Sequence, residues 1–187
     1  MKVKTIPVIL VILSVLLTGC GKSANQSQQS TKTQQSTQSA KTNPDVTTTA
    51  SIVNTGDAFV KAISKSGTWI IAVLNDLTIN QDLVVEGDFK NTKTPPVSER
   101  KLALYAQDAN RKVTARYTLT APKMTIKSPD AQITNGTFKG DLYVSAKNFQ
   151  LIGATVDGNV YFTTDEAKST FKMDANSKIT GKQELKK

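Results

Sequence analysis

Few residues of this chain are of a type that does chemistry. The sequence has 187 residues, no His and a single Cys, at position 20. Without imidazole there is no Ser-His-Asp or Cys-His catalytic site and no His-ligated metal. One thiol excludes intrachain disulfides and zinc sites built from several cysteines. Aromatic residues make up only 6% of the chain, which argues against a large aromatic pocket.

Carboxylates are the next candidates. Asp130, Asp141 and Asp157 would supply the oxygen ligands of a calcium site if they converged, but Asp is also common at turns for local hydrogen bonding. Glycoside hydrolysis needs two carboxyl groups about 5–10 Å apart, whereas Asp165 and Glu166 are adjacent in a polar segment that we expect to be a solvated loop. We predict no catalytic residue, no metal and no cofactor.

Tyr143 and Tyr161 are the candidates for ligand stacking. They occupy the same position of an internal repeat, in which residues 137–144 match residues 155–162 after a shift of 18 residues. On an outer face the two rings would stack against sugar rings. The other interpretation is an aromatic ladder that stabilises the fold.

The repeat indicates the elements that position these residues. Its frame is apolar, any, Gly or Gln, Asp or Asn, apolar, any, apolar, and it recurs at 79–85 and more weakly at 179–185. A period of 18 to 23 residues without an internal helix is typical of stacked β units, because leucine-rich repeats need a helical register and propeller blades are about twice as long. We therefore predict an all-β fold, a parallel β-helix (β-solenoid) of about 18–23 residues per rung.

Stacking of equivalent positions predicts specific neighbours. The predicted interior columns are Phe138 with Val156 and Ile179, Leu142 with Val160, Val144 with Phe162, and Phe149 with Phe171. The predicted outward pairs are Tyr143 with Tyr161, Lys139 with Asp157, and Asp141 with Asn159. Residues 164–167 are expected to form a loop that absorbs extra length in the last repeat.

One helix is predicted, over 57–66, as an N-terminal cap of the β-helix. Thr55 or Asp57 would cap its start, Ala58, Phe59, Ala62 and Ile63 form an apolar face, and Gly67 would end it. Thr94-Pro95-Pro96 marks a loop. The predicted strands are 69–74, 77–79, 83–85, 101–106, 112–119, 124–126, 137–139, 142–144, 149–152, 160–162 and 170–173.

The N-terminus carries a targeting pattern. Lys2 and Lys4 precede an apolar run over 6–17, which is shorter than the roughly 20 residues of a membrane span and fits a signal peptide. The run ends in Leu17-Thr18-Gly19-Cys20, which resembles the lipobox of bacterial lipoproteins. The resemblance implies cleavage of residues 1–19, lipid attachment at Cys20, and location on the extracytoplasmic face of the cell membrane.

The segment after the cysteine predicts a tether. Residues 20–50 are rich in Ser, Thr and Gln with almost nothing apolar to bury, so we expect disorder, and we place the folded β-helix domain at 51–187. The formal net charge is +9. An exported protein does not meet nucleic acid, so the expected partners are the membrane, through the lipid, and an anionic envelope polymer or polysaccharide.

The repeat resembles two families. The sequences Gly140-Asp141-Leu142-Tyr143-Val144 and Gly158-Asn159-Val160-Tyr161-Phe162 are similar to the rungs of bactofilins, bacterial polymer-forming cytoskeletal proteins. The predicted cap helix followed by a β run resembles the start of right-handed β-helices of the pectin-lyase-like superfamily. Bactofilins lack a lipobox, and the calcium ligands and catalytic Arg of pectate lyases have no counterpart in this chain.

Together these features predict a non-enzymatic, lipid-anchored structural or binding module of the bacterial envelope. One alternative is a polysaccharide-binding or polysaccharide-active β-helix protein, and another is a polymer-forming, bactofilin-like scaffold. We expect a monomer, because the predicted helix covers one end of the stack and lysines replace the apolar columns at the other end, where they oppose strand addition.

Overall fold

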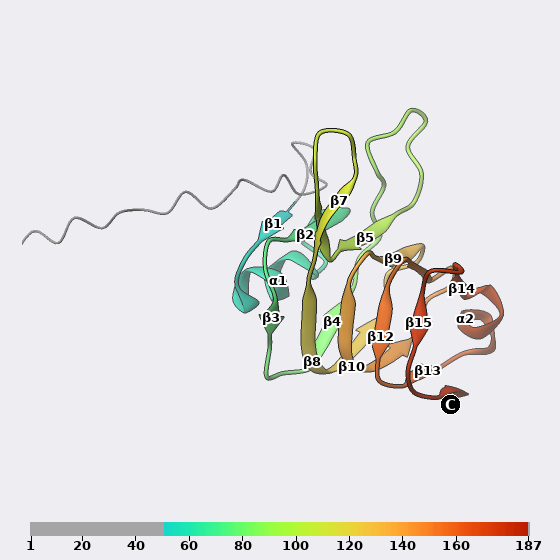
Figure 1. The fold of residues 1–187 in the computed structure, drawn as a ribbon. Coiled ribbons are helices and arrows are strands. Elements are labelled where there is room, and N and C mark those ends of the chain that lie inside the picture. Colours follow the sequence, from blue (N-terminus) through green and yellow to red (C-terminus); the bar gives the residue numbers. More distant parts are fainter. Residues whose placement is uncertain (1–50, 187) are drawn as a thin grey trace, which may run out of the picture. The chain divides into compact units, whose positions relative to one another are not determined.

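The computed structural model describes residues 51–186, which are mostly β-structure (Figure 1). The signal peptide over 1–19, Cys20 and the tether over 20–50 lie outside these residues. The helices are α1 (Gly56–Ala62) and α2 (Asp165–Thr170). The strands are β1 (Ser51–Val53), β2 (Ile70–Val73), β3 (Leu77–Thr78), β4 (Leu83–Val85), β5 (Arg100–Ala103), β6 (Tyr105–Gln107), β7 (Val113–Arg116), β8 (Thr118–Ile126), β9 (Ala131–Thr134), β10 (Thr137–Val144), β11 (Gln150–Ile152), β12 (Thr155–Asp157), β13 (Val160–Phe162), β14 (Lys172–Met173), β15 (Lys178–Ile179) and β16 (Gln183–Leu185).

The strands form three parallel ladders. Ladder A has the order β1-β2-β5-β9-β11-β14. Ladder B contains β3, the first half of β8, the first half of β10, β12 and β15, and ladder C contains β4, the second halves of β8 and β10, β13 and β16. Since β8 and β10 run through both, ladders B and C form one eight-stranded sheet. The chain passes repeatedly through A, B and C, and we call each pass a rung.

Residues paired on neighbouring rungs are 18 apart in the regular part of the stack, as for Phe138 with Val156 and Leu142 with Val160. The separation is 23 residues for Val156 with Ile179. These rungs confirm the predicted spacing. It is wrong for the first rungs, where Leu77 pairs with Leu119, because a loop over 86–99 and the β6–β7 hairpin are inserted there. Figure 1 shows both insertions projecting on the same side of the fold.

The predicted interior columns are confirmed. Their members pair in register and are buried, except that Ile179 at the end of the stack is half-buried. The confirmed neighbours are Phe138–Val156–Ile179, Leu142–Val160, Val144–Phe162, and Phe149–Phe171, whose rings stack with centroids 5.9 Å apart.

One position of the predicted frame is wrong. The frame over 79–85 placed Ile79 in the first column, but Leu77 pairs there with Leu119. Leu83 pairs with Met124 as the frame requires. The first rung therefore has two more residues between its columns than the later rungs, and Ile79 is buried at the corner between ladders B and C.

The glycines of the repeat are explained by close backbone contacts at this corner. Gly140 has a φ of 142°, and a Cβ on it would overlap the carbonyl oxygen of Ala121. A Cβ on Gly158 would likewise overlap the carbonyl oxygen of Gly140. Only glycine lets successive rungs stack at this distance while the chain turns from ladder B to ladder C.

Helix α1 is shorter than predicted. Thr55 caps it by accepting a hydrogen bond from the N–H of Ala58 (3.3 Å), but the helix ends at Ala62 and Gly67 is not its stop. The carbonyl of Ala62 accepts a bond from the Arg100 side chain (2.8 Å). A Cβ on Gly67 would overlap that carbonyl, so this glycine is needed for the returning chain to pass the end of the helix.

Helix α2 corrects the prediction of a loop over 164–167. The Thr164 side chain accepts a hydrogen bond from the N–H of Ala167 (3.0 Å), and Asp165 and Glu166 occupy the first turn, where negative charge is favourable. Ala167 is fully buried. The two carboxylates are therefore part of a helix start and not of a solvated loop.

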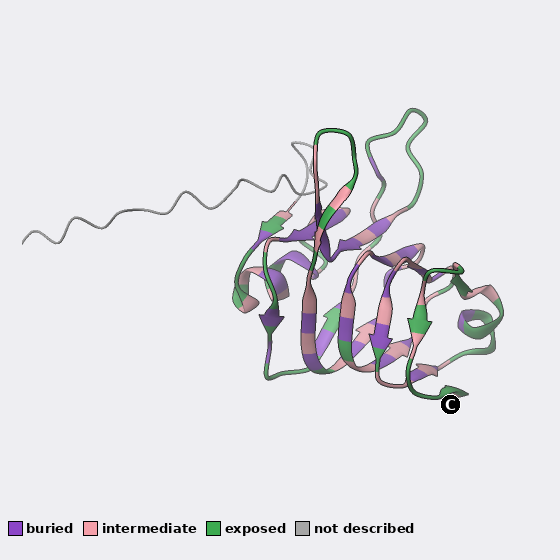
Figure 2. Ribbon diagram, in the orientation of Figure 1, coloured by how far each residue is buried: buried purple, intermediate pink, exposed green. Residues whose placement is uncertain are grey.

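The β6–β7 hairpin folds over the outer face of ladder A. Ala72 and Ala103 have no exposed surface because Tyr105 covers them. At the other end of the hairpin, Arg116 donates to the side-chain oxygen of Asn135 (3.2 Å) and to the carbonyl of Gly153 (2.9 Å). The hairpin replaces the single strand predicted over 112–119. Its tip and the 86–99 loop are exposed (Figure 2).

Arg100 is the largest fully buried side chain among the described residues. Its guanidinium donates to the carbonyls of Ala62 and Ser64 and lies 3.9 Å from the ring centroid of Phe89. In this part of the chain its Nε and Nη1 have no hydrogen-bond partner. Burial lowers the pKa of Arg100 to about 10. It therefore ties α1, the 86–99 loop and β5 together with an unpaired charge.

Candidate functional site

Tyr143 and Tyr161 lie side by side on the outer face of ladder C. They are paired in register on β10 and β13, and their ring centroids are 4.9 Å apart with the planes tilted by 42°. Both are half-buried. The predicted outward pairing is thus confirmed, and each ring uses part of one face to contact the other.

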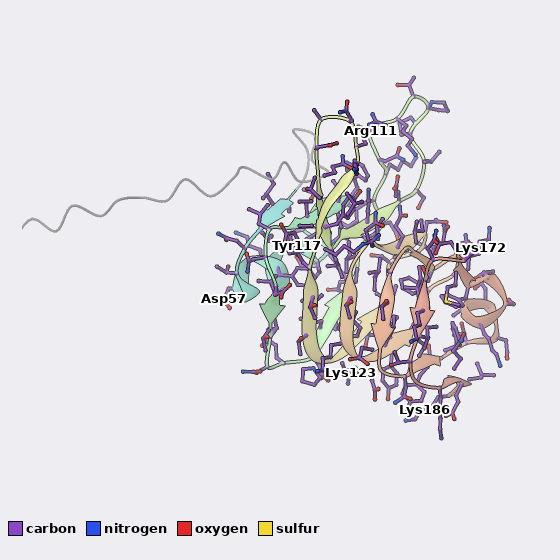
Figure 3. The ribbon with its side chains drawn as sticks, in the orientation of Figure 1. Asp57, Arg111, Tyr117, Lys123, Lys172 and Lys186 are labelled. Atoms are coloured by element: carbon purple, nitrogen blue, oxygen red, sulfur yellow. The ribbon has the colours of Figure 1, made fainter. Side chains whose placement is uncertain are left out.

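Two lysines flank this pair, and sequence reasoning did not find them. The ammonium of Lys186 lies 4.7 Å from the ring centroid of Tyr161 and donates to the hydroxyl of Tyr143 (3.4 Å). The ammonium of Lys123 lies 5.8 Å from the Tyr143 ring centroid. Figure 3 labels both lysines on the same side of the molecule. We call these four residues the tyrosine–lysine cluster.

The cluster offers donors more than open ring faces. Because the rings contact each other and the ammonium groups, a sugar ring would have to displace lysine to stack on them. The groups available to a ligand are the ammonium protons and the phenol hydroxyls, which donate to phosphate, sulfate or carboxylate oxygens. The geometry suits an anionic or hydroxyl-bearing ligand better than face-to-face stacking.

The charges of the cluster are partly neutralised. Lys123 forms an ion pair with Asp82 (2.5 Å), and the hydrogen bond and attraction of Asp82 raise the pKa of Lys123. Lys182 pairs with Glu184 nearby (3.7 Å). Lys186 forms no ion pair within the described residues, so it is the cation most available to a ligand.

An open groove of about 530 Å³ runs beside the cluster, at the corner between ladders B and C. Its floor is the small-residue column Ala121, Gly140 and Gly158, and its edges carry the polar side chains Asn80, Thr120, Lys139, Asp141 and Asp157. It crosses four rungs, a length of about 14 Å at the usual strand spacing.

The two aspartates of the groove are both engaged. Asp141 accepts hydrogen bonds from the backbone N–H and the side-chain amide of Asn159 (3.2 and 2.9 Å), which confirms the predicted contact between these residues. Asp157 accepts from the hydroxyl of Thr180 (3.0 Å) and is paired in register with Lys139. Each carboxylate still has lone pairs that could accept from ligand hydroxyls.

The three aspartates considered for calcium are not brought together. Asp141 and Asp157 line the groove, whereas Asp130 lies at the start of ladder A and accepts from the side-chain amide of Asn148 (2.9 Å). Among residues 51–186 there is no group of three acidic, Cys or His side chains suited to a metal ion. Nor does this part of the chain contain a helix long and apolar enough to cross a membrane.

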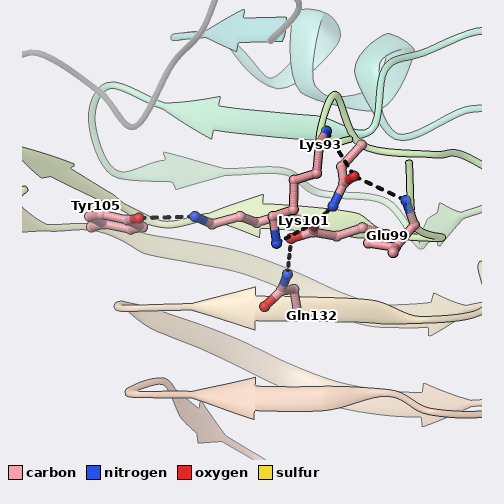
Figure 4. A network of polar contacts seen from close by, with 7 residues as sticks. Lys93, Glu99, Lys101, Tyr105 and Gln132 are labelled. Atoms are coloured by element: carbon pink, nitrogen blue, oxygen red, sulfur yellow. Dashed lines mark hydrogen bonds and ion pairs between the residues drawn. The ribbon is translucent and has the colours of Figure 1, made fainter. Parts of the chain in front are cut away.

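A second polar network lies on ladder A (Figure 4). Glu99 accepts from the side-chain amides of Gln132 and Asn91, and Lys101 donates to the hydroxyl of Tyr105 (3.1 Å). These bonds attach the 86–99 loop to β9 and the hairpin to β5. The network joins the two insertions to the ladder and adds no cavity, so we assign it a structural role.

Comparison with protein family models, with curated proteins and with solved structures finds no match to this chain.

Proposed function

We propose that this protein is a lipid-anchored lipoprotein of the bacterial envelope whose folded domain, residues 51–187, is a right-handed parallel β-helix acting as a binding module. The 18-residue register between rungs supports the β-helix, since parallel strand crossovers are almost always right-handed. The apolar run and Leu17-Thr18-Gly19-Cys20 support the anchor. Lipid attachment would hold the module at the extracytoplasmic face of the membrane.

The tyrosine–lysine cluster carries the proposal for the ligand. Its ammonium groups suit anionic substituents, and the adjoining groove offers Asp141, Asp157, Asn80 and Thr120 to hydroxyl groups. A polymer with both kinds of group fits better than a bare polyanion, because the groove carboxylates repel one. The proposed partner is therefore an acidic polysaccharide or another hydroxyl-bearing anionic polymer of the envelope, bound without catalysis.

Binding of alginate to the full chain in detergent micelles tests the ligand. We expect alginate to bind and neutral dextran not to, and we expect Lys186→Gln to weaken alginate binding about tenfold, since exposed charge-assisted contacts contribute roughly 1 kcal/mol each. Added salt should weaken binding as well. The matched control is Lys112→Gln in the hairpin, which removes the same charge from another exposed site. Equal binding of Lys186→Gln and Lys112→Gln would contradict the site.

Lipid attachment is tested by replacing Cys20. In cells grown with labelled palmitate, wild type should be labelled and Cys20→Ala should not, because the thiol is the only group that can form the thioether. The unlipidated variant should also remain unprocessed or leave the membrane fraction. Equal labelling of the two proteins would refute the anchor.

A further inference from the structure

The last rung ends the stack with open strand edges. β14, β15 and β16 each pair on one side only, with β11, β12 and β13. The N–H groups of Lys172 and Asp174 bond to Phe149 and Leu151. Alternation along a strand therefore directs the N–H of Met173 away from the stack, and the same pattern holds for Ile179 between Lys178 and Thr180.

Side chains of the interior columns are also uncovered at this end. Met173 pairs with the buried Leu151 yet is 43% exposed, and Ile179 and Leu185 are half-buried although they continue buried columns. Figure 2 shows β15 far more exposed than β12 beside it. The end therefore presents backbone donors and apolar side chains together, which is the surface to which an extended peptide adds as a further strand.

The charge of this end selects the partner. Residues 168–186 contain five lysines, at 168, 172, 178, 182 and 186, and only two carboxylates. Both carboxylates are already engaged: Asp174 accepts from Ser177 and Gly153, which lowers its pKa, and Glu184 pairs with Lys182. The lysines would repel a second copy approaching with the same end and attract an acidic segment.

The opposite end of the stack is different. There β1 is the outermost strand of ladder A, and α1 packs against β1 and β2. Six strands separate Ser51, where the described domain begins, from β14, about 24 Å at the usual strand spacing. The cationic edge is thus at the end of the domain that lies away from its N-terminal connection.

We propose that the edge formed by β14, β15 and β16 binds an extended acidic segment of another protein by β-strand addition. The backbone of the segment would pair with the outward N–H and C=O groups of the edge. Its apolar side chains would cover Met173 and Ile179, and its carboxylates would pair with Lys172 and Lys178. This site is separate from the polymer site, which uses Lys123 and Lys186.

The test uses the full chain in detergent micelles and a fluorescent peptide of alternating Glu and Val, with binding followed by anisotropy. We expect the peptide to bind, and Lys172→Glu/Lys178→Glu to weaken binding at least tenfold. Lys112→Glu/Lys147→Glu makes the same charge change at exposed sites elsewhere and should bind like wild type. Equal binding by these two variants would overturn the proposal.

A second peptide separates strand addition from charge attraction. It carries the same number of glutamates with proline in place of valine, so it cannot form a ladder. We expect it not to bind, and binding equal to that of the Glu-Val peptide would overturn the strand model. Sedimentation without peptide should give a single copy per micelle, whereas self-association lost in Lys172→Glu/Lys178→Glu would assign the edge to a second copy instead. Alginate binding should survive in Lys172→Glu/Lys178→Glu, which keeps this result distinct from failure of the polymer site.

Discussion

Val156→Asp is expected to unfold the domain. Val156 has no exposed surface and lies on β12 between Phe138 and Ile179 of the neighbouring rungs. A carboxylate there would be buried without a partner, at a cost of several kcal/mol, which is a large part of the 5–15 kcal/mol that stabilises a typical domain. Chemical denaturation followed by circular dichroism should show loss of the cooperative transition or a strongly lowered midpoint.

A matched substitution on the surface distinguishes burial from a general sensitivity of the last rungs. Lys172 is exposed on β14, and Lys172→Ala should change stability by less than about 0.5 kcal/mol. If Val156→Asp unfolded at the same denaturant concentration as Lys172→Ala, the register of ladder B would be wrong.

Arg100→Ala is expected to destabilise the domain by roughly 3 kcal/mol. The substitution removes the hydrogen bonds to the carbonyls of Ala62 and Ser64, the contact with Phe89, and the volume of a fully buried side chain. Both carbonyls lie at the end of α1, so the helix and the 86–99 loop should loosen together. Urea denaturation gives the magnitude, and hydrogen exchange should show the loss of protection in these two segments.

Arg100→Met separates volume from charge. Methionine keeps much of the packing and removes the buried unpaired charge, so the loss should be smaller than for alanine. Since the folded-state pKa of Arg100 is about 10 and its ordinary value is 12.5, the unfolded state binds more protons between those values. Stability of wild type relative to Arg100→Met should therefore rise as pH increases through this window. Equal losses for alanine and methionine at all pH values would show that only the hydrogen bonds matter.

The stacking of the last rungs was predictable because a repeat of fixed length places equal positions next to each other. Phe138 over Val156, Tyr143 over Tyr161 and Asp141 over Asn159 follow directly from the 18-residue shift. The same argument failed where the repeat is interrupted. The β6–β7 hairpin has no counterpart in other rungs, and α2 depends on the cap at Thr164 and on the burial of Ala167, which single-residue preferences indicate only weakly.

The tyrosines of the candidate site were found from the sequence, and its lysines were not. Lys123 belongs to β8, where the register shifts opposite Gly140 because the strand has one more residue at the corner, so the repeat does not align it. Lys186 follows the last recognisable repeat, and its contact with the rings requires the strand pairing of β13 with β16. Arg100 was missed because its partners, Ala62 and Ser64, are far away in the sequence.

The two insertions also show how cheaply the stack admits extra chain. Leu77 and Leu119 pair across 42 residues and Phe138 and Val156 across 18, yet both pairs occupy the same column. Loop-closure entropy grows only with the logarithm of loop length, so the longer connection costs roughly 0.7 kcal/mol more than the shorter one. Rung stacking repays that amount with one or two buried side chains. The corners flanking ladder A are therefore places where segments of new sequence can be added or exchanged while the register of ladders B and C is kept.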